Sequence, residues 1–203
     1  MIKCQVCVCG AISRGASMKK DKEDNPFVSF GVKYPVIGRD KEVLDLDISV
    51  TTDGGKDLVS VYTTGRRVEI NGVLTIRKKD GRIYLNLRAD EGGIKLAKTT
   101  AGDKFEGTME FKGKIGKNGV DEKPDKRGNT FKSFSAFSSD RNGDKTDFTW
   151  VRFLYFNPKD GENFLQANAY VECHGDLQLG VYKGVLSLDC LLKDVAVWEL
   201  NKQ

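Results

Sequence analysis

The sequence predicts an all-β protein that is built from two copies of one five-stranded barrel. Period-two patterns of apolar and polar residues dominate the chain, and no segment keeps a helical period for more than about two turns. The second observation is an internal repeat that covers about half of the chain. A repeat of this length is a duplicated domain, because the units of solenoid proteins have only about 20–50 residues.

Three pairs of segments carry the repeat. Residues 20–27 match residues 124–131 at a shift of 104, whereas residues 68–74 match 171–177 and residues 80–87 match 183–190 at a shift of 103. The identical pairs in the first match are Asp21 and Asp125, Lys22 and Lys126, Asn25 and Asn129, and Phe27 and Phe131. Residues that both copies share report the fold, and residues in only one copy suggest a divided function.

Turn signals divide each copy into five strands. The expected strands lie near residues 3–12, 27–34, 45–52, 67–76 and 82–90, and near residues 106–116, 130–138, 148–157, 169–179 and 184–199. Between the third and fourth strands, residues 56–62 and 160–166 could each form a turn or two of helix. Five strands with this insert follow the order of the OB-fold, a Greek-key barrel. The predicted fold is therefore two tandem five-stranded OB-fold barrels with minimal helix.

The expected boundaries follow from a weakly patterned stretch that bears glycine and threonine at residues 91–103. We expect an OB-fold domain at residues 1–93, a linker at residues 94–104 and a second OB-fold domain at residues 105–203. Each half has about 100 residues, which is enough for a core of its own.

Charge and aromatic residues are divided unevenly between the copies. The formal net charge is +4, and residues 1–103 hold 18 basic and 14 acidic residues against 15 and 15 in residues 104–203. The first stretch has 5 aromatic residues and the second has 14. A mildly basic chain is compatible with nucleic acid as a partner, although ordinary solvated charge is a commoner cause of so small an excess.

The chain has no apolar run of about 18 residues, so no membrane span is expected. Its start also lacks the apolar stretch and cleavage site of a signal peptide, and we expect a soluble, cytoplasmic protein.

The cysteines have two possible interpretations. Residues 4–9 contain a C-x-x-C-x-C string that suggests zinc, but the comparable stretch of the second copy has Thr108, Glu110 and Lys112. The fold therefore does not need these cysteines, and an odd number does not suit a fully paired disulfide framework. We interpret all five as small, buried or half-buried strand residues: Cys4, Cys7, Cys9, Cys173 and Cys190.

The second copy resembles a known family. Its residues 146–156 contain Trp-x-Arg-x-x-x-Phe, and residues 170–177 end in Gly-x-Leu, as in the core of bacterial single-stranded DNA-binding proteins. Residues 111–115 and 131–137 resemble the first and second strands of that family, and the first copy matches more faintly. Two features differ: the family has a longer helix between its third and fourth strands, and it usually carries an acidic tail that is expected to be missing here.

Strand alternation separates core residues from candidate binding residues in the second copy. Trp150, Arg152 and Phe156 lie on one face with Leu154, and the resemblance places this face in the DNA groove. The other face, with Val151, Phe153 and Tyr155, is expected to fill the barrel, as are Phe134 and Ala136 on the preceding strand. Phe131 and Phe137 are expected to point outward, and Tyr182 resembles the aromatic residue of the family's last hairpin. Core packing remains the alternative for each outward ring.

The first copy lacks such a face. Leu44, Leu46, Ile48 and Val50 form the apolar side of its third strand, and Asp45, Asp47, Ser49 and Thr51 form the polar side. A shift of 104 would match Leu46 to Trp150, but burial favours a slip of one residue that inverts the faces. Asp45 and Asp47 are then expected to replace Trp150 and Arg152, and carboxylates in a phosphate groove would repel DNA. The basic hairpin at residues 77–82 either contacts phosphates or is a solvated tip.

These observations predict a protein that binds single-stranded DNA without catalysis. The predicted DNA-binding residues are Trp150, Arg152, Phe156, Phe137, Phe131, Lys132, Tyr182, Arg77, Lys78 and Lys79. His174 is the only histidine, and no catalytic, metal-binding or cofactor motif is found, so we expect no enzyme activity, metal or cofactor.

The resemblance implies roles in DNA replication, recombination, or phage or mobile-element DNA metabolism, and a homodimer with four barrels around one strand. RNA stays open as a ligand. The alternatives are a module for protein interaction or assembly and an oligosaccharide binder.

Overall fold

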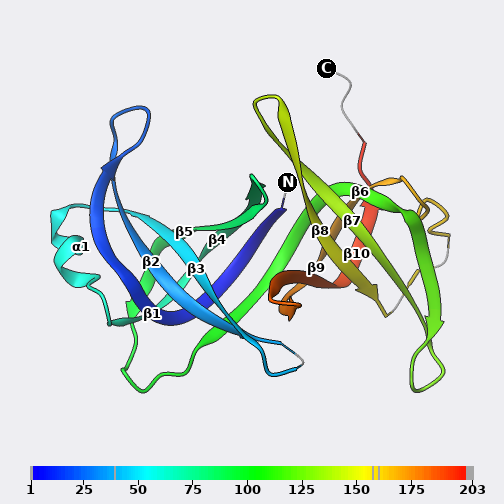
Figure 1. Cartoon of the computed structure of the whole chain (residues 1–203), viewed down its shortest axis with the longest axis horizontal. Coiled ribbons are helices and arrows are strands. Elements are labelled where there is room, and N and C mark those ends of the chain that lie inside the picture. Colours follow the sequence, from blue (N-terminus) through cyan, green and yellow to red (C-terminus); the bar gives the residue numbers. More distant parts are fainter. Residues whose placement is uncertain (1, 39, 157, 160, 200–203) are drawn as a thin grey trace.

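The computed structural model describes residues 2–38, 40–156, 158–159 and 161–199. Within these ranges, the chain forms two barrels that lie side by side (Figure 1). The elements of the first barrel are β1 (Ile2–Lys20), β2 (Pro26–Ile37), β3 (Val43–Asp53), α1 (Lys56–Val61), β4 (Arg67–Lys79) and β5 (Arg82–Leu96). The strands of the second are β6 (Lys104–Pro124), β7 (Thr130–Asn142), β8 (Lys145–Tyr155), β9 (Tyr170–Tyr182) and β10 (Val185–Val197). The barrels are connected by residues 97–103, within the predicted linker.

Each barrel closes through one parallel pairing in an otherwise antiparallel sheet. In the first barrel, β1 pairs with β2 and β4, and β3 pairs with β2 and runs parallel to β5. In the second, β6 pairs with β7 and β9, and β8 pairs with β7 and runs parallel to β10. Register shifts at Ile12/Arg14 in β1 and Ile115/Val120 in β6 bend these long strands, so that each can pair on both sides. This arrangement confirms the predicted five-stranded barrels.

The second predicted helical segment is wrong. Residues 161–166 form turns, and residue 160 lies outside the described residues. The N–H of Leu165 donates to the carbonyl of Glu162, and the N–H of Gln166 donates to that of Phe164, so these bonds are too short in sequence for an α-helix. The predicted helix at residues 56–62 is confirmed by α1.

Matching loops support the duplication. Asp21 follows β1, and its Oδ1 accepts a hydrogen bond from the backbone N–H of Asn25 at 2.9 Å. Asp125 follows β6, and its Oδ1 accepts one from the N–H of Asn129 at 2.8 Å. These backbone hydrogen bonds stabilise the charged carboxylate, and they lower the pKa of both aspartates below the ordinary value.

The barrels join through an antiparallel pairing of β1 with β6. The pairing of β1 with β4 repeats in the second barrel at a shift of 103 residues. Ala11 pairs with Arg67 in the first barrel, and their counterparts Lys114 and Tyr170 pair in β6 and β9. At this shift Thr108 is the counterpart of Gln5, and these two residues pair with each other across the junction. An approximate two-fold axis therefore passes through the junction.

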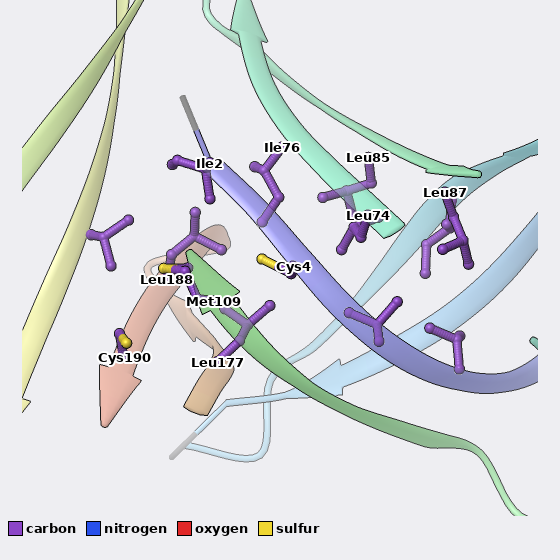
Figure 2. Packing of buried hydrophobic residues seen from close by; sticks show 14 of the residues in the cluster. Ile2, Cys4, Leu74, Ile76, Leu85, Leu87, Met109, Leu177, Leu188 and Cys190 are labelled. Carbon is purple, nitrogen blue, oxygen red and sulfur yellow. The ribbon is translucent and has the colours of Figure 1, made fainter. Parts of the chain in front are cut away.

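Buried apolar side chains form one cluster that includes both barrels. Figure 2 shows Ile2 and Cys4 of β1 close to Met109 of β6 and Leu188 of β10. All four side chains are buried. The shared core fixes the orientation of the barrels, and with it the position of every loop at the junction.

Candidate nucleic-acid interface

β8 separates its core residues from its exposed rings by alternation. The side chains of Val151, Phe153 and Tyr155 are buried in the barrel, whereas Trp150 is 52% exposed and Phe156 is 45% exposed. The core is therefore complete without these two rings. The predicted orientation of β8 is confirmed.

In β7 the same alternation separates buried side chains from outward-facing rings. Phe134 and Ala136 are buried, and Phe137 pairs with Trp150 on the outer face of the sheet. The ring centroids of Phe137 and Trp150 are 4.9 Å apart. At the far end of the face, the rings of Phe131 and Phe156 stack with centroids 5.2 Å apart.

One ring of this surface is not among the predicted residues. Phe148 in β8 is 44% exposed, and its ring contacts Phe137 edge-on with centroids 5.2 Å apart. It lies two residues before Trp150, so the same alternation would have identified it. We call the surface formed by these five aromatic side chains the ring face: Phe131, Phe137, Phe148, Trp150 and Phe156.

A groove of about 490 Å³ runs beside the indole of Trp150. Its lining includes Lys117 in β6, Phe131 and Arg152. A Cβ at Gly116 would lie only 3.1 Å from Cζ3 of the indole, so the glycine leaves room for the ring.

Arg152 shares the ring face but is already paired. Its Nε donates to Oδ1 of Asp189 at 3.0 Å, and its Nη2 donates to Oδ2 of the same carboxylate. The parallel pairing of β8 with β10 places these two residues opposite each other. A two-point contact of this kind holds the guanidinium in one plane.

Lys132 is not brought to the ring face. It pairs with Tyr155 on the inward-facing register of β7, and its side chain is mostly covered. Its ammonium lies 4.0 Å from a carboxylate oxygen of Glu122.

Tyr182 lies at the tip of the β9–β10 hairpin and is 67% exposed. It lines a second groove, of about 890 Å³, together with Trp150, Arg152 and Ile37 of the first barrel. Oε2 of Glu42, next to β3, accepts a hydrogen bond from the N–H of Gly184 at 3.1 Å. The first barrel thus holds the hairpin that carries Tyr182.

The basic hairpin of the first barrel meets the second barrel in the reciprocal way. Oδ2 of Asp147 accepts a hydrogen bond from the N–H of Asp80 at 3.0 Å, and Asp140 accepts one from the N–H of Lys78 at 3.5 Å. The side chains of Arg77 and Lys79 are exposed. These two predicted residues therefore lie next to the β7–β8 hairpin, close to the Phe148 end of the ring face.

The register corrects the predicted match between the barrels. Ser49 pairs with Asn86 in β3 and β5, as Arg152 pairs with Asp189 in β8 and β10, which sets a shift of 103. Ser49 is therefore the counterpart of Arg152, and Asp47 is the counterpart of Trp150. The predicted matches of Asp45 to Trp150 and Asp47 to Arg152 are wrong by two residues. The predicted orientation of β3, with its apolar side inward and its acidic side outward, is confirmed. Leu46, Ile48 and Val50 are buried, and Asp45 and Asp47 are exposed.

The cysteines lie in the strands as expected. Cys4, Cys9, Cys173 and Cys190 are buried and Cys7 is half-buried. Burial raises the pKa of the Cys4 and Cys190 thiols to about 12. Over the described ranges, no group of three or more histidine, cysteine, aspartate or glutamate side chains could hold a metal ion, and no helix could cross a membrane.

Comparison with known proteins shows the fold. No protein-family model matches the sequence, and no curated protein matches it. The wild-type single-stranded DNA-binding protein from Thermus aquaticus is similar over 100% of this chain and 95% of that chain, with 10% identity and a TM-score of 0.51. The two proteins share their fold. The prediction of tandem OB-fold barrels like those of single-stranded DNA-binding proteins is confirmed.

Two further structures are similar at lower TM-scores. A deletion mutant of the Thermus aquaticus protein has 12% identity and a TM-score of 0.49, covering 100% of this chain and 97% of that one. The mitochondrial single-stranded DNA-binding protein from S. cerevisiae has 27% identity and a TM-score of 0.34, covering 47% of this chain and 96% of that one.

Proposed function

We propose that this chain binds single-stranded DNA, largely without sequence preference, by stacking bases on the ring face of its second barrel. The observation that carries the proposal is the presence of five aromatic side chains on the outer surface of a barrel whose core is filled from the opposite side. Every base has a flat face, so stacking on such rings tolerates any sequence, and each stack contributes about 1–3 kcal/mol.

The length of the ring face suits several nucleotides. Phe148 and Phe156 are eight positions apart in and just beyond β8, which corresponds to roughly 26 Å at about 3.3 Å per residue. OB-folds bind about 4–16 nucleotides of single strand each. We expect the strand to follow β8, with Lys117 in the groove beside Trp150 and with Arg77 and Lys79 near the Phe148 end.

The fold supports the proposal, because the similar structure from Thermus aquaticus is a single-stranded DNA-binding protein. Holding single strands without catalysis would serve replication, recombination, or phage or mobile-element DNA metabolism. Competition between oligo-dT and oligo-rU for the ring face would distinguish DNA from RNA as the preferred ligand.

Tryptophan fluorescence tests the proposal, because Trp150 and Trp198 are the only tryptophans. We expect oligo-dT to quench the emission, and Trp150→Ala to remove most of the quenching. Trp198→Phe is the matched control, since Trp198 is not a residue of the ring face and lies against Tyr170 of β9 with ring centroids 5.9 Å apart. Quenching that persists in Trp150→Ala and disappears in Trp198→Phe would overturn the assignment of the ring face.

We also propose that two chains associate, so that four barrels surround one strand. Sedimentation or light scattering should then give a mass twice the 22.6 kDa of one chain. A mass of one chain, both with and without oligo-dT, would contradict the dimer.

The acidic side of β3 favours a second candidate function, an interaction with another protein. Asp45 and Asp47 are exposed where the other barrel has rings, and the ammonium of Lys33 lies 3.4 Å from a carboxylate oxygen of Asp45. Salt distinguishes the two functions, because the affinity for DNA falls steeply with salt as counterions are released. The absence of any binding to oligo-dT at low salt would favour the protein-interaction module.

A further inference from the structure

The ion pair between Arg152 and Asp189 determines which charge and which hydrogen-bond donors the centre of the ring face offers to a ligand. The carboxylate is mostly covered, with 18% of its side chain exposed, whereas 47% of the Arg152 side chain is exposed. Arg152 therefore faces the grooves on both sides, and Asp189 holds it from beneath. The pair carries no net charge.

Comparison with the first barrel separates this pair from the needs of the fold. The counterparts of Arg152 and Asp189 are Ser49 and Asn86, which pair at the same place in β3 and β5. Both charges are missing in the barrel that has no ring face, although the barrel closes in the same way. The two charges thus occur together with the rings.

The two-point contact also determines which donors remain. A guanidinium has five N–H groups, and Asp189 accepts hydrogen bonds from Nε and Nη2. Among the described residues no hydrogen bond involves Nη1, and 47% of the Arg152 side chain is exposed. A planar guanidinium can stack on a base and can donate to its edge.

We propose that Asp189 is a positioning residue that converts Arg152 from a phosphate-binding cation into a charge-neutral platform for bases. This inference rests on the proposed function and makes it more specific. Arg152 then contributes affinity through stacking and hydrogen bonds between Trp150 and Phe156, and it adds nothing to the salt dependence of binding.

The salt dependence of oligo-dT binding tests the proposal. A cation that meets a phosphate of a single strand contributes about 0.7 to the slope of log affinity against log salt. We expect the double variant Arg152→Gln with Asp189→Asn, which removes both charges of the neutral pair, to weaken binding roughly tenfold at every salt concentration, with an unchanged slope. Arg152→Lys should weaken binding as much as this double variant, because lysine keeps the charge but lacks the plane.

Asp189→Asn should free the guanidinium and steepen the slope by up to about 0.7. The double variant with Arg152→Gln should return the slope to its wild-type value. The double variant also replaces the pair with two neutral amides, so it leaves neither an unpaired guanidinium nor an unpaired carboxylate at this place. Thermal unfolding of each variant is measured alongside.

The outcomes separate this inference from the proposed function. If the wild-type protein does not bind oligo-dT, the proposed function fails. If it binds, and the double variant lowers the slope by about 0.7 while Arg152→Lys keeps both slope and affinity, Arg152 is an ordinary phosphate contact and only the inference fails.

Discussion

Asp47 in β3 occupies the position that Trp150 occupies in β8. The pairing of β3 with β5 and of β8 with β10 sets this equivalence, and both side chains are exposed on the outer face of their barrel. One copy of the duplicated domain thus presents a carboxylate where the other presents an indole. The two copies therefore share the barrel and differ in the side chains on its outer surface.

This division predicts different effects of matched changes at the two positions. Trp150→Ala should cost about 1–3 kcal/mol of binding free energy to oligo-dT, as expected for a lost stack. Asp47→Ala should leave the affinity within about twofold, because the proposed path of the strand does not follow β3. Titration at a single salt concentration measures both. An equal loss for the two variants would show that the strand crosses both barrels alike.

Gly116→Ala should weaken binding without unfolding the protein. The new methyl group would lie 3.1 Å from Cζ3 of the Trp150 indole and would displace the ring from its place beside Phe137. The expected signs are a shifted tryptophan emission and lower affinity for oligo-dT. Gly102→Ala is the matched control, because no atom lies within 4 Å of its added Cβ. If both variants bind like the wild type, the position of the indole does not matter for binding.

The cations of the basic hairpin at residues 77–82 should contribute to the salt dependence of DNA binding. Arg77→Ala with Lys79→Ala should flatten the salt dependence by about 0.7 for each cation that meets a phosphate. Lys78 is left unchanged, since its side chain is only half-exposed where the hairpin meets Asp140 of the second barrel. Lys95→Ala with Lys98→Ala, at the connection between the barrels, is the control of equal charge. An unchanged slope in the first variant would exclude this hairpin from the binding path.

Thiol labelling should follow burial. Cys7 is half-buried, whereas Cys4 and Cys190 are buried and their pKa values are raised to about 12 from the ordinary 9.0. At pH 8 we therefore expect an alkylating reagent to modify Cys7 first, and Cys4 and Cys190 only after unfolding. Peptide mass spectrometry over time gives the order. Rapid labelling of Cys4 in the folded protein would contradict the packing at the junction.

The same shifts predict how stability changes in alkali. A thiol whose pKa is raised by folding stabilises the folded state fully below its unfolded pKa, and this contribution is lost as the pH rises through the folded value. For Cys4 the loss should occur between pH 9.0 and about 12. Denaturant unfolding across this range should show less dependence on pH in Cys4→Ala. An identical pH dependence in this variant would place the alkaline loss elsewhere.

The sequence was sufficient to predict the barrels and the orientation of most rings. Alternation depends only on neighbouring residues, so it correctly separated Phe153 from Trp150 and Leu46 from Asp47. It would also have identified Phe148, had the outer face been followed to the start of β8.

The match between the copies could not be predicted because their alignment changes twice. The shift is 103 in β1 and β6, 104 in β2 and β7, and 103 again in β3 and β8. One change falls at the register shifts where β1 and β6 bend, and the other at the hairpin that follows β2 or β7. Bulges and turns absorb single residues without disturbing the core, so the sequence carries little record of where the offset occurs.

Contacts between distant segments were also beyond the sequence. The pair of Arg152 and Asp189 depends on the parallel closure of the barrel, and the contact of Asp147 with the first-barrel hairpin depends on the junction between β1 and β6. Neither is encoded by local periodicity.

Crosslinking tests the central claim most directly. Oligo-dT is irradiated with ultraviolet light in complex with the wild-type protein, and the crosslinked residues are identified by mass spectrometry. We predict crosslinks to the ring face, foremost to Trp150, Phe148 and Phe156, and none to β3. Crosslinks to β3 of the first barrel, with the ring face unmodified, would contradict the proposed interface.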